Sequence, residues 1–599
     1  MIHSGKFFGM AQTSFSLKKL VLIFFLINLG LKLFHIQYNP SALTYDEVIY
    51  TAEAQSIVKY GTDLKGGWKP WHLEPSDSYY TELTSTVLTP GFLIFPNNPI
   101  LASKFVPVLL GSLIPIFLGL LAYRLRKNKN VFIVTTLFAT LNPWVFQFSR
   151  MGYDSLFSIG FYLLGMLVVL YAKEWRKLWA VIPLFLGFFQ YQGHKPLLVP
   201  LIFICVVFLF FEKYSVPSVF KQFKKVITDK SIVAAKIVFI FSFVLTVSYL
   251  IRLPHLTSSE RASEFSVYDE VQLSSSVNEA RRMSLNSPVT SLFINKYTLL
   301  LTQLTDRFLN SFDLKRLFIE GDRRVDTFSV LDYGYFHLAD IFIIVIALAF
   351  VIYNKKDFKT LAFVLSFILI GTLPNVIRTG EPWILLRGAF LFLGIILLSG
   401  IGIASFLDRL QKKYVVAFFV LYILATTPFF FTYFYRYPIS HTKNIGFYER
   451  VLASYVSRAT TSDEEVFLVP DRDDATFVYL IHYNALLTDE NKDQVSESMH
   501  SRKYAINSIH VEGGCTEEVK TSENKKVVVF SMKEPCQPTV NSSQKVEIKS
   551  LIDSGTIFTI YNDTLCQDYN LGSYSHVKKN VFNIENLSNQ EFCESFFSK

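Results

Sequence analysis

The sequence has 599 residues, of which 51% are apolar and 16% aromatic, including 58 Phe residues. Only 18% are charged, against roughly 25% in a soluble domain. Ordinary numbers of Gly (27) and Pro (22), with abundant order-promoting residues, exclude collagen-like and disordered chains. The composition therefore predicts a polytopic membrane protein with a soluble part, and not the four soluble domains that the length suggests.

Apolar runs of near 20 residues can cross a hydrocarbon core of about 30 Å. The first run follows Lys6, Lys18 and Lys19 but has no small-residue cleavage site, so it is predicted to be a membrane span and not a signal peptide. We expect eleven transmembrane helices, at residues 19–36, 101–123, 131–148, 155–172, 177–193, 196–212, 232–251, 338–353, 358–374, 384–406 and 414–433.

Short basic hinges separate alternate pairs of these spans, and basic loops mark the cytoplasmic side of a membrane protein. The hinges lie at residues 124–129, 173–177, 213–230, 355–359 and 409–413. This pattern predicts an integral protein of the plasma membrane or an equivalent membrane, with a cytoplasmic N-terminus. The longer segments 37–100 and 252–337, and everything after residue 434, are then extracytoplasmic.

We expect the chain to consist of two parts: a membrane part at 1–436 and an extracytoplasmic domain at 437–599. The second part holds 16 Lys and Arg against 23 Asp and Glu, although the whole chain has a net charge of +9. The positive charge therefore belongs to the membrane part. It indicates topology and contact with lipid headgroups, and not binding of nucleic acid.

The extracytoplasmic part alternates short apolar stretches with helical patterns, which predicts a small α/β domain. Strands are expected at Glu465–Val469, Thr476–His482, Lys526–Met532, Val546–Leu551 and Thr556–Tyr561, and helices at Gly446–Ser457 and Asp489–His500. The domain holds four of the five cysteines, and an even number in this compartment permits two disulfides; four unpaired thiols are the alternative. These cysteines are Cys515, Cys536, Cys566 and Cys593, and their spacing fits no zinc pattern.

A helix is expected from about Thr44 to Lys59 in the first outer loop, ended by Gly61. Thr44 and Glu47 have the spacing of a capping box, so one interpretation is that the Glu47 carboxylate serves only to accept the Thr44 backbone N–H. Asp46 lies about 100° around the helix from Glu47, so the two acids cannot both face one reacting atom. If Glu47 caps the helix, Asp46 is left to face a site at the membrane surface.

Other charged side chains also lie at the outer ends of spans. Arg150 and Asp154 could form a simple i,i+4 pair. Lys195, after His194, could be an anchor in the lipid headgroups. Arg387 lies a turn inside a span, where a charge is costly and often functional, although a snorkelling side chain is the alternative. Arg378 precedes it in the loop between the ninth and tenth spans.

One acid and several cations at the same face suit transfer of a group from a lipid phosphate. Phosphate is a good leaving group that needs charge stabilisation, which Arg and Lys provide. The acceptor hydroxyl or amine needs a base, and a carboxylate can serve. The sequence has no Gly-rich nucleotide loop between a strand and a helix and no Walker motif, which disfavours a nucleotide-sugar donor or an ATP-driven pump.

With these segments in this order, the chain resembles the GT-C superfamily of polytopic glycosyltransferases. It resembles in particular the dolichyl-phosphate-mannose protein mannosyltransferase-like family and the lipid A aminoarabinose transferases. The resemblance covers about residues 15–435 and depends on Asp46-Glu47, the segment from Asn142-Pro143 to Asp154, Gly193-His194-Lys195-Pro196 and the loop 374–387. It implies a polyprenyl-phosphate sugar donor, an outward-facing active site and transfer with inversion.

The resemblance also implies roles for single residues. Asp46 with Glu47 would be catalytic, and Lys195, Arg387, Arg150 and Arg378 would bind the donor phosphate. Asp154 and His194 would organise the site. The central loop 252–337 lacks the MIR domain of the eukaryotic members, so the acceptor, whether protein, lipid or glycan, is left open.

A divalent metal ion is neither required by this chemistry nor excluded by it. Four acidic residues of the first loop could bind one, but a solvated loop surface is the favoured interpretation: Asp63, Glu74, Asp77 and Glu82. Two other protein classes compete with the transferase. A transporter or flippase of lipid-linked or anionic substrates would place charges near the bilayer midplane and often has repeated halves. A non-catalytic outer-surface protein would use its loops to bind partners.

Overall fold

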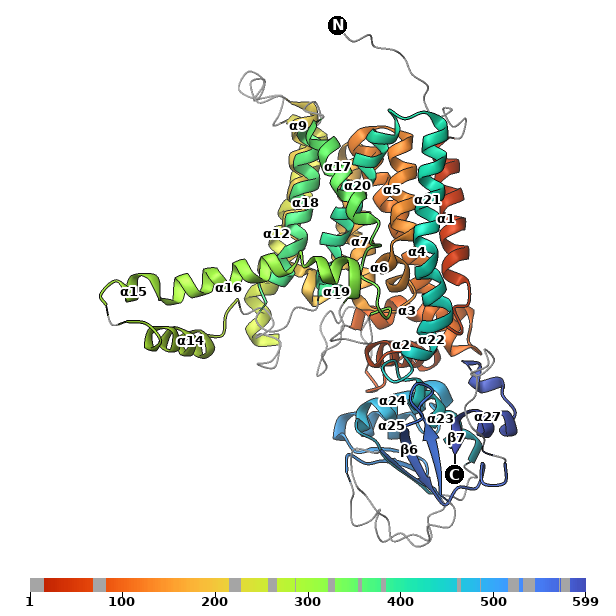
Figure 1. Ribbon diagram of the computed structural model, residues 1–599. Coiled ribbons are helices and arrows are strands. Elements are labelled where there is room, and N and C mark those ends of the chain that lie inside the picture. Colours follow the sequence, from red (N-terminus) through yellow and green to blue (C-terminus); the bar gives the residue numbers. More distant parts are fainter. Residues whose placement is uncertain are drawn as a thin grey trace.

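The fold was obtained as a computed structural model. It describes residues 16–67, 82–214, 228–256, 267–285, 287–321, 329–353, 358–378, 384–459, 465–484, 486–514, 527–531, 545–569, 571 and 582–598. Figure 1 shows a bundle of long helices, a lateral arm at one end of this bundle, and a mixed helix and sheet domain beyond the same end. Cys515, Cys536, Glu74 and Asp77, which the sequence singled out, lie outside the described residues.

The bundle is built from long apolar helices that run roughly parallel to one another (Figure 1). Seven helices in the described part of the chain are long and apolar enough to cross a membrane. The main helices of the bundle are α1 (Leu17–Leu33), α4 (Pro99–Arg126), α5 (Lys129–Leu141), α7 (Asp154–Tyr171), α9 (Leu198–Lys213), α12 (Lys230–Leu256), α17 (Asp340–Tyr353), α18 (Phe358–Val376), α20 (Ala389–Leu407) and α21 (Lys412–Phe431).

Several predicted spans are shorter or interrupted in the structure. The run 131–148 is not one helix: α5 ends at Leu141, and Asn142 caps a separate short helix, α6 (Pro143–Phe148), by accepting the Val145 N–H at 3.0 Å. The run 177–193 consists of the 3₁₀ helix η1 (Glu174–Ala180) and α8 (Val181–Phe188). The run 384–406 divides at Gly388 into α19 (Ile384–Arg387) and α20. The capping side chain of Asn142 and Pro143 at the first helical position explain the first of these breaks.

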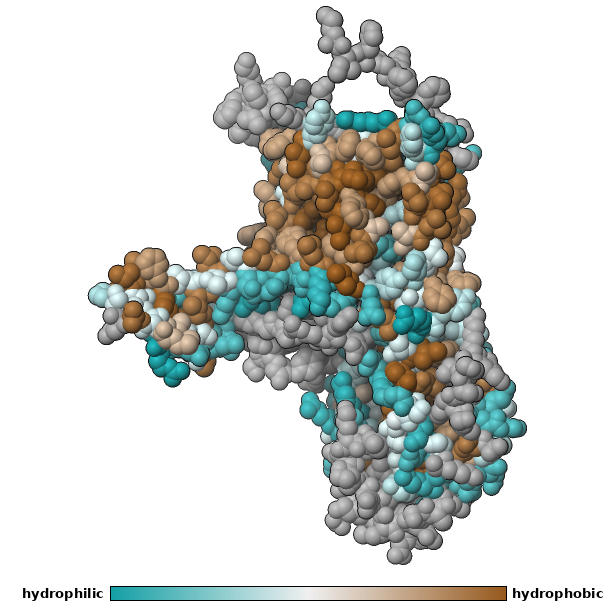
Figure 2. Space-filling model, in the orientation of Figure 1, coloured by the Kyte–Doolittle hydropathy of each residue, from teal (hydrophilic) through white to brown (hydrophobic). Residues whose placement is uncertain are grey.

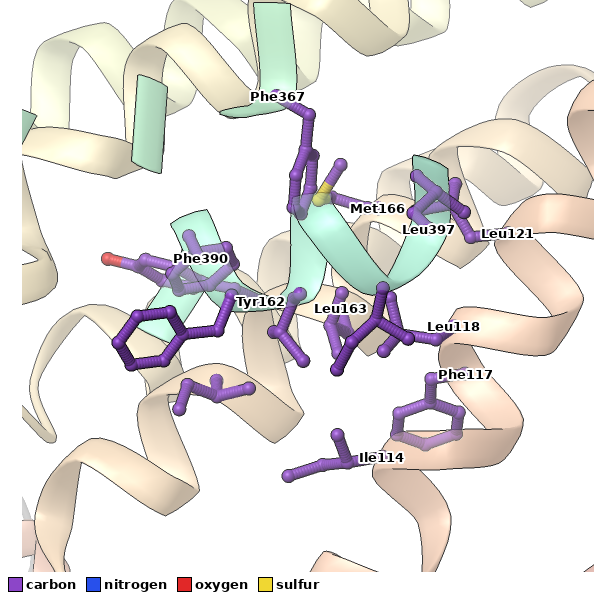
Figure 3. Packing of buried hydrophobic residues seen from close by; sticks show 14 of the residues in the cluster. Ile114, Phe117, Leu118, Leu121, Tyr162, Leu163, Met166, Phe367, Phe390 and Leu397 are labelled. Carbon is purple, nitrogen blue, oxygen red and sulfur yellow. The ribbon is translucent and has the colours of Figure 1, made fainter. Parts of the chain in front are cut away.

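The bundle core lies among α4, α7, α18 and α20. Figure 3 shows its packing, with Leu118 of α4, Met166 of α7, Phe367 of α18 and Leu397 of α20 turned toward one another. Gly371 lets α18 and α20 approach closely, because an added Cβ there would lie 2.2 Å from the Leu391 nitrogen. Nearly all of α20 is buried, whereas large apolar side chains of α12, α17 and α21 are exposed on the outside of the bundle, where lipid tails would lie.

The basic hinges gather at one end of the bundle. Arg124, at the end of α4, forms a bidentate ion pair with Glu212 at the end of α9. Asn128 and Asn130, in the turn to α5, donate to Asp408 after α20 at 3.0 and 2.7 Å. This clustering fits the predicted topology, in which the hinges share one side of a membrane.

Short helices and the C-terminal part lie at the opposite end (Figure 1). The helix α2 (Tyr45–Tyr60) and the helix α3 (Glu82–Ile94) belong to the first long loop and pack against each other and on the bundle. The arm contains α14 (Glu270–Arg282), α15 (Thr290–Phe293) and α16 (Lys296–Asn310).

The C-terminal part forms a seven-stranded mixed sheet with the order β2-β3-β1-β4-β6-β5-β7. Strand β1 pairs in parallel with β3 and β4, and the other pairings are antiparallel. The strands are β1 (Val466–Val469), β2 (Tyr504–Ile506), β3 (Ile509–Val511), β4 (Val527–Ser531), β5 (Val546–Lys549), β6 (Thr556–Tyr561) and β7 (Phe597–Ser598); the helices are α23 (Phe447–Ala459), α24 (Asp473–Asn484), α25 (Lys492–Ser501) and α27 (Asn589–Phe596).

The structure bears out four of the five predicted strands and both predicted helices here, and it corrects one element. The stretch Thr476–His482, expected to be a strand, lies inside α24. This helix is buried between the sheet and α2, so apolar residues occur all around it and no 3.6-residue period is visible. One disulfide joins Cys566 to Cys593, which ties α27 to the loop after β6.

Candidate functional site

The first turn of α2 is fixed by the Glu47 carboxylate. Its Oε2 atom accepts the Thr44 N–H at 3.0 Å and the Thr44 hydroxyl at 2.9 Å, which is the capping box that the sequence predicts. Its Oε1 atom accepts the Gly152 N–H at 2.5 Å, and the residue is only 1% exposed. Both oxygens are thus used within the fold. These contacts favour a structural role for Glu47 over the catalytic role implied by the resemblance.

Asp46 lies on a different face of α2. It is half-buried. Residues at i, i+4 and i+7 share a helix face, so Asp46, Tyr50 and Glu53 lie along one face, which we call the acidic stripe. The charges of both Glu47 and Asp46 act on the Tyr153 hydroxyl beside the helix. Burial, together with these two charges, holds the pKa of Tyr153 well above its usual range, so Tyr153 stays neutral and donates to Thr44 Oγ1 at 2.7 Å.

Asp154 meets this stripe at the start of α7. The Tyr50 hydroxyl donates to Asp154 Oδ2 at 3.2 Å, and Oδ1 of the same carboxylate accepts the Ser155 N–H at 2.7 Å. A carboxylate in the first turn of a helix is stabilised by the helix dipole and the unpaired N–H groups there. Asp154 therefore holds Tyr50 of α2 against the start of α7.

Arg150 does not lie beside Asp154. It is fully buried, and its guanidinium donates to the backbone oxygens of Lys32 and Phe34, both at 2.8 Å, and of Asn39 at 2.6 Å. The guanidinium also lies over the rings of Phe146, Tyr433 and Phe434. These contacts fasten the turn after α1, and they favour a structural role over the expected contact with a donor phosphate.

Hydrogen bonds continue from the acidic stripe toward the predicted cations. Glu53 Oε2 accepts the Ser85 hydroxyl at 2.7 Å, and the neighbouring Thr84 hydroxyl donates to Gln190 Oε1 at 2.7 Å. Gln190 lies two residues before the 3₁₀ helix η2 (Gln192–Leu197), which carries His194 and Lys195. Helix α3 thus links the acidic stripe to the loop that holds these cations.

The loop that carries His194 and Lys195 contacts the short helix that ends at Arg387. His194 is fully buried, and its Nε2 atom lies 3.0 Å from the Leu386 carbonyl oxygen, so η2 and α19 are in contact next to Arg387. The Lys195 ammonium lies 3.6 Å from the centre of the Tyr249 ring of α12. Lys195 is 3% and Arg387 7% exposed, so both cations are buried. Arg378 is half-buried two residues beyond the end of α18.

Three polar residues of this region were not singled out from the sequence. Glu53 belongs to the acidic stripe. Its i+7 spacing from Asp46 could have indicated from the sequence that the two residues share a helix face. Lys104 and Lys32 are buried, and they donate to the carbonyl oxygens of Pro40, at 2.6 Å, and Gly111, at 2.5 Å. A lone charge within an apolar run is a sign of such a role.

The C-terminal domain is joined directly to the segment that leads into α2. The Tyr483 hydroxyl accepts the Leu43 N–H at 3.1 Å, and the Tyr479 hydroxyl donates to the Leu43 carbonyl oxygen at 2.9 Å. Arg450 of α23 donates to the Ser41 carbonyl oxygen and forms a bidentate ion pair with Glu585. Docking of this domain therefore fixes the position from which α2 and Asp46 start.

The described residues contain no group of three or more His, Cys, Asp or Glu side chains arranged to hold a metal ion. Asp63, one of the candidate ligands in the first loop, accepts the N–H groups of Lys65 at 3.0 Å and Gly67 at 2.9 Å. These bonds stabilise the turn that follows α2.

No protein-family profile matches the sequence, and no curated protein matches it. Among solved structures, the chain is similar to ArnT from Cupriavidus metallidurans bound to undecaprenyl phosphate, at 11% identity and a TM-score of 0.40, over 91% of this chain and 98% of that chain. It is also similar to the oligosaccharyltransferase AglB from Archaeoglobus fulgidus, in complex with an inhibitory peptide and a dolichol-phosphate, at 12% identity and a TM-score of 0.43, over 86% and 69% of the two chains. Identity this low transfers no residue role to this chain.

Proposed function

We propose that this protein is a membrane glycosyltransferase that moves a sugar from a polyprenyl-phosphate donor to an acceptor at the outer membrane face, with inversion. In this proposal all eleven apolar runs cross the membrane, the N-terminus is cytoplasmic, and the domain at 437–599 is extracytoplasmic. The acceptor is a protein, lipid or glycan that presents a hydroxyl or amine.

One observation carries the proposal: an acidic stripe and a cationic wall are tied together at one end of an apolar bundle. The stripe contains Asp46, Tyr50 and Glu53, and the wall contains Lys195 and Arg387. The bonds from Glu53 through Ser85, and from Thr84 to Gln190, connect them. A lipid-linked phosphate reaches this level of the bundle with its chain still in the bilayer.

The chemistry follows from the two kinds of group. Asp46 accepts the proton of the acceptor hydroxyl or amine as that atom attacks the anomeric carbon of the sugar. The bond from the anomeric carbon to the phosphate oxygen breaks, and the polyprenyl phosphate leaves with the electron pair. Lys195 and Arg387 stabilise the negative charge that develops on the phosphate. A single displacement from the opposite face inverts the anomeric configuration.

The test is mass analysis of products after candidate polyprenyl-phosphate sugars are supplied to the purified, reconstituted protein with candidate acceptors. Asp46→Asn keeps the size of the side chain and removes the base. Asp63→Asn, in the turn that follows α2, is the matched control. Sugar transfer by the wild type and by the control, but not by Asp46→Asn, supports the proposal. Movement of the lipid-linked sugar across the membrane without a new glycosidic product would identify a transporter instead.

A further inference from the structure

A helical arm projects sideways from the bundle at the end where the candidate site lies (Figure 1). We define the arm as residues 269–310, which include α14, α15 and α16. In this view the arm lies across the direction of the bundle helices. This orientation is the one a helix would have if it lay along the surface of a membrane that the bundle crosses.

The arm is a folded hairpin and not an extended tail. Asp269 caps α14 by accepting the Gln272 N–H at 3.0 Å, and Asn295 caps α16 with a capping box. Leu273 and Val277 of α14 are buried. The Arg281 side chain also donates to the Ile294 carbonyl oxygen at 2.8 Å.

The free end of this hairpin exposes large apolar side chains. Leu285 is 92% exposed, Tyr297 85% and Leu301 66%. Leu292 and Phe293, between them in the chain, are 68% and 67% exposed. A soluble surface rarely carries so many large apolar groups in one place, and such a patch marks contact with a membrane or a protein.

Helix α16 has a polar side as well. Tyr297, Leu301 and Phe308 recur at i, i+4 and i+11 and follow one face, whereas Asp306 is exposed on the opposite side of the helix. An amphipathic helix of this kind can keep one side in the acyl region and the other in the headgroups.

The base of the arm lies at the level where a bundle helix ends. Arg307 donates to the Val376 carbonyl oxygen at 3.3 Å, and Val376 is the last residue of α18. Arg307 also donates to the Val267 carbonyl oxygen at 3.0 Å, which holds both ends of the arm together. Since α18 is one of the helices long and apolar enough to cross a membrane, its end marks the membrane boundary.

We infer that the arm lies in the surface of the lipid bilayer, with the side chains of Leu292, Phe293, Tyr297 and Leu301 inserted among the lipids. The occupant is the bilayer because the apolar belt of the bundle ends at the level of the arm, and apolar side chains gather at the arm's free end (Figure 2). The apolar side chains at the free end of the arm and the apolar surface of the bundle would therefore both contact lipid. This inference does not depend on the proposed glycosyl transfer.

The experiment places the photo-cross-linker p-benzoylphenylalanine at position 301 or, as a matched control on the opposite side of the same helix, at position 306. The full-length protein is reconstituted in vesicles of phosphatidylethanolamine and phosphatidylglycerol, irradiated and examined by mass spectrometry. Both positions are exposed, so neither replacement disturbs the packing.

We expect lipid adducts at position 301 in at least tenfold excess over position 306. Equal lipid yields at the two positions would overturn the inference. Cross-links from position 301 to a second copy of the chain, without lipid adducts, would also overturn it and identify the patch as a protein interface.

Discussion

The Tyr50 hydroxyl donates to the Asp154 carboxylate at 3.2 Å and so joins the middle of α2 to the start of α7. Asp46 lies one turn before Tyr50 on the same face of α2. The contact therefore fixes the rotation of α2 about its axis and determines which way the Asp46 side chain faces. Asp154, near the membrane boundary, thus orients Asp46, the candidate base, which lies on the loop helix α2.

Replacing Glu47 with Gln should lower the free energy of unfolding by about 1–3 kcal/mol, because an amide nitrogen would face one of the buried donors that the carboxylate now accepts. The donors are the N–H groups of Thr44 and Gly152. Thermal unfolding of the purified protein in detergent measures the change. The control is Glu591→Gln, which alters a capping box of the same type at an exposed position. Equal losses for the two variants would contradict the structural role of Glu47.

Replacing Arg387 with Gln should weaken binding of a polyprenyl phosphate by about 10- to 100-fold, because a hydrogen bond to a charged group is worth about 1.5–3 kcal/mol. The measurement is equilibrium binding of undecaprenyl phosphate to the purified protein. Arg409→Gln is the control, since Arg409 follows the other end of α20 and stacks on Phe350. An unchanged affinity in Arg387→Gln would remove Arg387 from the donor site.

The C-terminal domain should lose stability in mild acid through His482. Burial lowers the pKa of His482 to about 3, whereas an unfolded histidine titrates at about 6.5. The unfolded chain therefore takes up the proton first, so this contribution to stability is complete above about pH 6.5 and declines as the pH falls toward 3.

His482→Phe should make the melting temperature depend less steeply on pH between about 6.5 and 4. Circular dichroism follows the unfolding, and His500→Gln, at an exposed position of α25, is the control. Parallel pH curves for His482→Phe and the wild type would show that His482 does not cause the loss.

The disulfide between Cys566 and Cys593 closes a loop with a sequence separation of 27 residues. In the chain-entropy model such a loop stabilises the folded state by about 3 to 4 kcal/mol. Each single Cys→Ala variant and the double variant should lose a similar amount, since one missing partner already breaks the bond. Chemical denaturation of the three variants tests this. If the double variant lost about twice as much stability as each single variant, the two thiols would act independently.

Local signals predicted the start of the site well. The capping box at Thr44 and Glu47 depends on residues three apart, so the sequence alone indicates that Glu47 turns inward and that Asp46 does not. His194, Lys195 and Arg387 share a place at the outer ends of predicted spans, which puts them at one end of the bundle. Which of these ends meet depends on helix packing, since Arg150, at another outer end, contacts the turn after α1 instead.

The remaining features depend on contacts between distant segments. Arg150 and Asp154 have the spacing of a helical pair, but Arg150 precedes α7 and reaches the turn after α1. The Asn142-Pro143 pair carries the signature of a helix start, yet the continuous apolar composition on both sides conceals the break. Helix α24 was mistaken for a strand because it is buried on every side. Such burial is a property of the tertiary structure.

The central claim is that Asp46 is the base of a sugar transfer from a polyprenyl phosphate. The most direct measurement compares the rate of glycosidic product formation by the wild type, Asp46→Asn and Asp63→Asn in vesicles, with a donor that the wild type uses. Loss of a general base costs roughly 10²- to 10⁴-fold in rate. We predict a loss of this size for Asp46→Asn with unchanged melting temperature, and none for Asp63→Asn. An unchanged rate in Asp46→Asn would contradict the account.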